Sequence, residues 1–197
     1  MHKIAIYTDY VCPYCLLAEK VVQDAIGDLP VEIEWRAFEL RPEPVPTLRV
    51  EDPYLPAIWQ RSVYPIAARL GIPIRLPSWS PQPRTAKAFE VLALAKERGA
   101  GHAYSLGVLR AFFQEDRNIG DPDVLVELAA EAGLDRNEVR KALDEGTYEQ
   151  SHREALRHAR EDMAITSVPT IVVGEQVFRG MPTVDELKSA ILLAKHS

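Results

Sequence analysis

The sequence predicts an α/β fold that is interrupted by a large all-helical block. Strand-like segments fall only near the two ends of the 197-residue chain. Between them, several helices are marked by capping residues and glycines, and no stretch shows the alternation of a strand. We therefore predict that residues 1–55 and 164–197 form one α/β domain, and that residues 56–163 form a helical domain inserted into it.

The strands are predicted from alternating and β-branched residues at both ends. Residues 4–8 are apolar, and residues 31–40 begin by alternating apolar and charged side chains. Residues 170–173, a turn at Gly174 and residues 176–178 are typical of a hairpin. A final helix follows, with a capping box of Thr183 and Glu186. Its apolar stripe is predicted to be Leu187, Ile191 and Leu192.

The helices of the middle block are predicted from ordinary start and stop signals. Their ranges are 56–70, 85–98, 102–114, 122–132, 136–145 and 148–162. Asp121 is the expected N-cap of the fourth, with Pro122 at its first position. Capping boxes start the last two, and they pair Asp135 with Glu138 and Thr147 with Gln150.

The composition limits the classes of partner. A hydrophobic content of 47% and a charged content of 26% are ordinary for a globular protein. The net charge of -6 argues against binding to nucleic acid or to acidic membranes. No window reaches about 18 uninterrupted apolar residues, so we expect no membrane span and a cytoplasmic protein.

The chemistry is concentrated in the motif Cys12-Pro13-Tyr14-Cys15, which follows the first strand and opens a helix. Pro13 fits the first helical turn, where its missing N–H has no partner to lose. Cys12 then lies at the helix N-terminus, a setting that favours a thiolate. Cys15 lies about one turn further in, within disulfide reach. We expect Cys12 to be an exposed attacking thiol and Cys15 a sheltered resolving thiol, as thiol–disulfide exchange requires.

Two other interpretations of the cysteines compete with this one. A zinc site could be completed by His152 and His158, but six residues on one helix place those rings about 240° apart around its axis. The two cysteines could instead be plain core residues. The proline at the helix start and the strand–turn–helix context argue against that, so we expect no metal and no resident cofactor beyond the cysteine pair.

A second motif, Ser167-Val168-Pro169-Thr170, precedes the apolar strand of the hairpin. Together with the cysteine motif it resembles the thioredoxin fold, in which a cis-proline loop faces the active-site cysteines. The resemblance makes Pro169 the cis-proline, and it makes Val168 the residue that binds an extended substrate strand by β-augmentation. It implies that Cys12 and Cys15 are catalytic, and that substrate binds at Pro13, Tyr14, Val168, Pro169 and Thr170.

The whole chain resembles the DsbA-like oxidoreductases, which have a thioredoxin fold with a large helical insertion. Segments 38–42, 112–134 and 178–182 are similar to the FrnE-type branch, which is related to 2-hydroxychromene-2-carboxylate isomerases and kappa-class glutathione transferases. The resemblance implies a thiol–disulfide oxidoreductase or isomerase that acts on protein, peptide or small-molecule disulfides, with glutathione as a candidate co-substrate. The isomerases and transferases typically carry a serine at the position of Cys12, so the cysteine favours dithiol chemistry.

Some alternatives stay open at this point. A glutathione-dependent isomerase or transferase of the same fold is one, and a non-catalytic thioredoxin-like chaperone is another. Asp9, three residues before Cys12, could relay a proton to or from Cys15 or could stabilise the strand-to-helix turn. We favour the turn. Aromatic residues such as Trp59 could line a substrate groove or could simply pack under a long loop.

Overall fold

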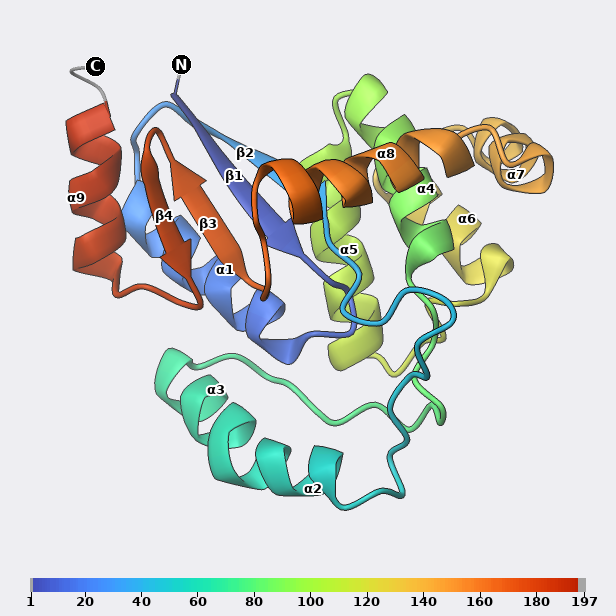
Figure 1. Ribbon diagram of the computed structural model, residues 1–197, viewed down its shortest axis with the longest axis horizontal. Helices are drawn as coiled ribbons and strands as arrows, with labels where there is room; N and C mark the ends of the chain where they lie inside the picture. Colours follow the sequence, from blue (N-terminus) through green and yellow to red (C-terminus); the bar gives the residue numbers. More distant parts are fainter. Residues whose placement is uncertain (1, 195–197) are drawn as a thin grey trace.

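The computed structural model describes residues 2–194. Within that range, four strands form one mixed sheet in the order β2-β1-β3-β4 (Figure 1). They are β1 (His2–Thr8), β2 (Val31–Ala37), β3 (Thr170–Val173) and β4 (Gln176–Arg179). β1 pairs with β2 in parallel and with β3 antiparallel, so strands from both ends of the chain are neighbours. This confirms the predicted α/β fold class.

Two helices belong to this α/β unit. α1 (Pro13–Ile26) connects β1 to β2, as a parallel strand pair requires. α9 (Val184–Ala194) follows β4 and packs against α1. Its capping box is confirmed, because the Glu186 N–H donates to Oγ1 of Thr183 and the Thr183 N–H donates to the Glu186 carboxylate.

The remaining helices fall into two groups (Figure 1). One group is a hairpin-like arm below the sheet in the figure, and the other packs beside β2. The arm contains α2 (Tyr54–Ile58), the π-helical turn η1 (Trp59–Val63) and α3 (Tyr64–Leu70). The second group contains α4 (Ala86–Glu97), α5 (Gly101–Phe113), α6 (Pro122–Glu131), α7 (Arg136–Glu145), α8 (Glu149–Arg157) and the π-helical turn η2 (His158–Asp162). None of the helices described within residues 2–194 is both long and apolar enough to cross a membrane.

Three sequence-based expectations about these elements are wrong. β2 ends at Ala37 rather than at residue 40, because the following peptides turn to bond with the end of β1. The capping box at the start of α8 does not form: Tyr148 is the N-cap, and the Gln150 side chain donates to Glu154 instead. Leu192 lies outside the buried stripe of α9, with 42% of its surface exposed.

One continuous hydrophobic core joins the sheet to the inserted helices. Tyr10, which follows β1, stacks on Phe89 of α4 with ring centroids 4.5 Å apart. Its hydroxyl is 2.9 Å from Oγ of Ser105 in α5, which satisfies a polar group that is fully buried. The loop that leads to Cys12 is therefore anchored in the same core as the helical insertion.

We expect the Phe89→Ala variant to lose about 3–5 kcal/mol of unfolding free energy, because the ring is 2% exposed and its removal leaves a cavity beside Tyr10. Denaturant unfolding measures the loss. Leu193→Ala is the control, since 63% of that side chain is exposed and its truncation should cost little. Equal losses in the two variants would contradict a core that depends on Phe89.

Candidate active site

Local geometry places Cys12 at the start of α1. Cys12 is the N-cap, with φ -94° and ψ 112°, and Pro13 is the first helical residue. The Cys12 N–H donates to the carbonyl of Asp9 at 3.0 Å, and the Cys15 N–H donates to the carbonyl of Cys12 at 3.1 Å. Both cysteines are free thiols. Cys12 therefore lies beside the unpaired backbone N–H groups of a helix N-terminus.

Cys12 is more buried than the sequence suggested. Cys12 is only 5% exposed, so the expectation of an exposed attacking thiol is wrong for the reduced protein. The cause is the loop before β3, which covers it: Sγ of Cys12 donates to the carbonyl of Val168 at 3.5 Å. Cys15 is fully buried, as expected for the sheltered thiol.

The loop over Cys12 has the geometry expected from its proline. The Val168–Pro169 bond is cis, which confirms that part of the prediction. The Pro169 carbonyl accepts the Gly180 N–H at 2.8 Å, and Oγ1 of Thr170 donates to the carbonyl of Ser167 at 2.7 Å. Val168 stays partly exposed, whereas Pro169 and Thr170 are buried supports behind it.

A cavity of about 190 Å³ opens next to Cys12. Tyr14 lines it and donates a hydrogen bond to Oγ of Ser62, at 2.7 Å, in the helical arm. Trp59 lines it too, but only 1% of this residue is exposed and its ring packs against Phe113. The walls are mostly apolar; they include Val11, Pro13, Leu40, Leu48, Tyr54, Leu55, Ile58 and Val63, with Arg41 and Gln82 as polar members.

The environment of Cys15 keeps its thiol protonated. Burial raises the pKa of Cys15 well above its usual value, and the hydrogen bond and charge of Cys12 raise it further. The Thr8 hydroxyl and the Asp9 backbone act in the opposite direction on this pKa. Thr8 is a site residue that sequence reasoning missed. It is fully buried at the end of β1, and no sequence motif marks it.

Asp9 is fully enclosed and bonds with the turn. Its Oδ2 accepts the Leu40 N–H at 2.7 Å, and its carbonyl holds the Cys12 N–H. Burial raises the pKa of this carboxyl to about 6, while the Leu40 N–H and the Thr85 hydroxyl lower it and the charge of Glu39 raises it. These contacts agree with the turn-stabilising role of Asp9.

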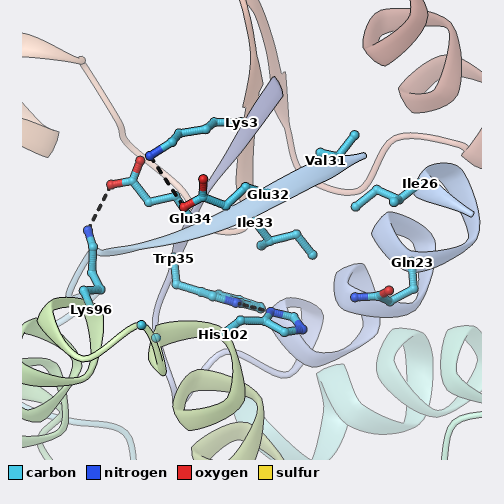
Figure 2. A pocket seen from close by; sticks show the side chains of 12 residues that line it. Lys3, Gln23, Ile26, Val31, Glu32, Ile33, Glu34, Trp35, Lys96 and His102 are labelled. Carbon is cyan, nitrogen blue, oxygen red and sulfur yellow. Dashed lines mark hydrogen bonds and ion pairs between the residues drawn. The ribbon is translucent and has the colours of Figure 1, made fainter. Parts of the chain in front are cut away.

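A larger cavity, of about 530 Å³, lies elsewhere on the molecule (Figure 2). It runs along the outer edge of β2, where Nε1 of Trp35 donates to Nδ1 of His102 at 2.9 Å. Charged side chains form its rim, among them Lys3 and Lys96. Neither cysteine lines it, so the smaller cavity beside Cys12 is the candidate active site.

The two histidines considered as zinc ligands are each paired with a carboxylate. Nε2 of the buried His152 is 2.5 Å from Oε1 of Glu39, and Nδ1 of the exposed His158 is 2.7 Å from Oδ2 of Asp162. No cluster of three or more metal-ligating side chains occurs in the described part of the chain.

Comparison with known proteins now assigns the family. The sequence pattern of the DSBA-like thioredoxin domain matches residues 3–192. The chain belongs to this family. It is 46% identical over 189 residues to the uncharacterized protein YwbO of Bacillus subtilis (strain 168), a match that covers 95% of this chain and 94% of that protein. It is 26% identical to a probable DsbA oxidoreductase, SCO1869, of Streptomyces coelicolor, with a TM-score of 0.81 over 100% of this chain and 91% of that one.

Two neighbours with 18% identity share the fold. A 2-hydroxychromene-2-carboxylate isomerase matches with a TM-score of 0.79 over 98% of this chain and 97% of its own. The cytosolic disulfide reductase DsbM of Pseudomonas aeruginosa matches with a TM-score of 0.75 over 98% of each chain, and a second structure of DsbM contains glutathione. The resemblance of the sequence to DsbA-like proteins and their isomerase relatives is confirmed at the level of family and fold, as is the thioredoxin fold with its helical insertion.

The raised pKa of Asp9 predicts a stability that depends on pH. The neutral acid is favoured in the folded state, so this contribution is fully present below about pH 4 and is lost as the pH rises through about 6. We expect Asp9→Asn, which keeps an acceptor for the Leu40 N–H but carries no charge, to gain about 2–3 kcal/mol over the wild type at pH 7.5 and little at pH 4. Urea unfolding at both pH values tests this, and an equal effect at the two would contradict a buried charge at Asp9.

Proposed function

We propose that this DsbA-like protein is a dithiol–disulfide oxidoreductase that works through Cys12 and Cys15. The observation that carries the proposal is the position of Cys12: its sulfur lies at the start of α1 and in contact with the carbonyl of Val168, beside the cis-proline. A helix N-terminus supplies the N–H groups and the dipole that favour a thiolate. The family supports oxidoreductase chemistry, and the cysteine pair provides the groups for it.

The proposed reaction has two exchange steps. The Cys12 thiolate attacks one sulfur of a substrate disulfide, which forms a mixed disulfide and releases the first substrate thiolate. Cys15 then loses its proton and attacks Sγ of Cys12, which forms the Cys12–Cys15 disulfide and releases the second. Two electrons pass from the dithiol to the substrate. Because burial keeps the Cys15 thiol protonated, Cys15 does not attack substrate before the mixed disulfide has formed.

The surroundings of Cys12 fit an extended peptide. Val168 would pair with a substrate strand through its backbone, while the apolar cavity beside Cys12 would accept an apolar side chain next to the reacting cysteine. Pro13 and Tyr14 line this cavity and would contact that side chain. Pro169 and Thr170 would support this strand from behind.

The direction of electron flow and the small-molecule partner are also part of the proposal. Tyr14 carries no positive charge that would stabilise the Cys12 thiolate further, which favours a reductase or isomerase over a strong oxidant. Glutathione is a candidate co-substrate, since it is present in a structure of the fold neighbour DsbM, which is described as cytosolic. We propose a cytoplasmic location because that fold neighbour is cytosolic.

Turbidity of insulin in the presence of dithiothreitol tests the function. We expect the wild type to accelerate precipitation, and Cys12→Ser to abolish the acceleration because the attacking thiol is lost. Iodoacetamide should modify Cys12 well before Cys15 in the reduced protein. Insulin precipitation at the uncatalysed rate with wild type, or first labelling at Cys15, would overturn the proposal; the former result would favour a non-catalytic chaperone.

A further inference from the structure

A buried acid–base pair joins the inserted helices to the segment behind the active site. Glu39 lies two residues beyond the end of β2, and His152 lies on α8; both are 5% exposed. Nε2 of His152 is 2.5 Å from Oε1 of Glu39. Neither side chain has a part in the exchange steps above.

Residues 38–40 are bonded to the end of β1. The Phe38 N–H donates to the carbonyl of Thr8 at 2.9 Å, and the Leu40 N–H donates to Oδ2 of Asp9 at 2.7 Å. The carbonyl of Asp9 in turn accepts the Cys12 N–H. A displacement of residues 38–40 would therefore pass through Asp9 to the backbone of Cys12.

Phe38 and Glu39 are held from the other side by α8 and η2. Besides the bond to His152, the Glu39 carbonyl accepts a hydrogen bond from Nη2 of Arg160 at 2.8 Å. The Arg160 guanidinium also lies over the Phe38 ring, 5.2 Å from its centroid. The peptide between Glu39 and Leu40 is thus fixed by the inserted helices on one side and by Asp9 on the other.

Burying Glu39 and His152 costs free energy that an apolar contact between residue 39 and α8 would not cost. Nδ1 of His152 is buried without a hydrogen-bond partner among the described residues, although the ring is fixed by stacking on Phe89 at 5.5 Å. Burying such a pair takes desolvation energy that an apolar contact of similar size would not require. Stability alone therefore does not account for the pair. What it adds over an apolar contact is one fixed position of Glu39.

Resting on the proposed dithiol function, we propose that Glu39 and His152 form a positioning pair. The pair holds the Leu40 N–H against Asp9 and thereby keeps Sγ of Cys12 in line for attack by Cys15. The inserted helices would then contribute to the second exchange step and not only to substrate binding.

The pair also has an electrostatic effect on Asp9. The charge of Glu39 raises the pKa of Asp9, so its removal should lower that pKa. Around Asp9 the other titratable or charged groups are Cys12 and Cys15 of α1, Tyr10, Arg41 and Arg84. Around His152 they are Arg160 and, across a cavity of about 300 Å³, Tyr7, Glu34, Arg36, Lys96 and His158.

The aromatic disulfide dithiobis(nitrobenzoate) separates the two exchange steps in the whole protein. Attack by the Cys12 thiolate forms a mixed disulfide and releases one nitrothiobenzoate. Attack by Cys15 on Sγ of Cys12 then forms the protein disulfide and releases a second. Two electrons pass to the reagent and two protons pass to the solvent, so the two releases can be followed by absorbance after rapid mixing.

His152→Phe keeps the stacked ring and removes the bond to Glu39. We expect its second release to slow about tenfold, because a small misplacement of reacting atoms is costly, while the first release stays within about twofold. His152→Gln, whose amide can donate to Glu39, should restore most of the rate. His158→Gln, the same change in the exposed pair with Asp162, is the matched control and should have no effect.

Glu39→Gln supplies a readout that a purely structural role would not change. It keeps the shape and the hydrogen bond but removes the charge that raises the pKa of Asp9. The loss of stability that accompanies ionisation of Asp9, followed by urea unfolding against pH, should therefore move to lower pH, while the second release stays within about twofold of wild type because the position of Glu39 is kept. An unmoved stability profile, or a second release as slow as that of His152→Phe, would overturn the proposal.

Other outcomes separate this inference from the proposed function. A folded His152→Phe protein with an unchanged second release overturns the positioning role, and so does a His152→Gln protein as slow as His152→Phe. Circular dichroism establishes folding, and if His152→Phe does not fold, the Glu39→Gln profile and the His152→Gln rate decide the question. A wild type that releases only one nitrothiobenzoate refutes the dithiol function itself.

Discussion

The antiparallel pairing of β1 with β3 is the constraint on which the candidate site depends. It aligns Tyr7 with Thr170, so the end of the strand that leads to Cys12 lies beside the start of the strand that follows Pro169. The contact between Sγ of Cys12 and the carbonyl of Val168 is a consequence of that register, because a shift by one residue would turn every side chain of β3 to the other face. The backbone pairing of β1 with β3 thus places the reacting sulfur beside the surface that would bind substrate.

Burial has different effects on the three titratable groups near this junction. Burial raises the pKa of Cys15, so its thiol stays protonated. Burial also raises the pKa of Asp9, to about 6, so this carboxyl is ionised at neutral pH and its buried charge lowers the stability of the fold. Cys12 is 5% exposed, and its sulfur contacts the carbonyl of Val168 in the loop before β3. The site therefore combines a rigid base, made of strand ends and helix starts, with a cover that comes from a distant part of the chain.

The sequence predicted the fold and the cysteine pair because both depend on local signals: alternating residues, capping residues and the Cys-Pro-Tyr-Cys motif. Pro169 was identified through the resemblance of its motif, taken together with the cysteine motif, to the thioredoxin fold. Thr8, Glu39 and His152 have no such signal, because their roles depend on partners brought together by tertiary contacts. The exposure of Cys12 was misjudged for a similar reason, since the residue that covers it lies 156 positions away. The capping box predicted at Thr147 does not form because Tyr148 is the N-cap, so a local sequence signal can be overridden by the position at which the helix begins.

Cys12 and the loop before β3 that covers it lie far apart in the sequence, which has a consequence during synthesis. A ribosome that adds about 5–20 residues per second needs about 8–30 s to travel from Cys12 to Val168. Throughout that interval β1 lacks its antiparallel neighbour, and Cys12 is without the loop that covers it in the finished molecule. A nascent chain is therefore open to oxidation and to mixed disulfides at Cys12 until β3 has joined the sheet.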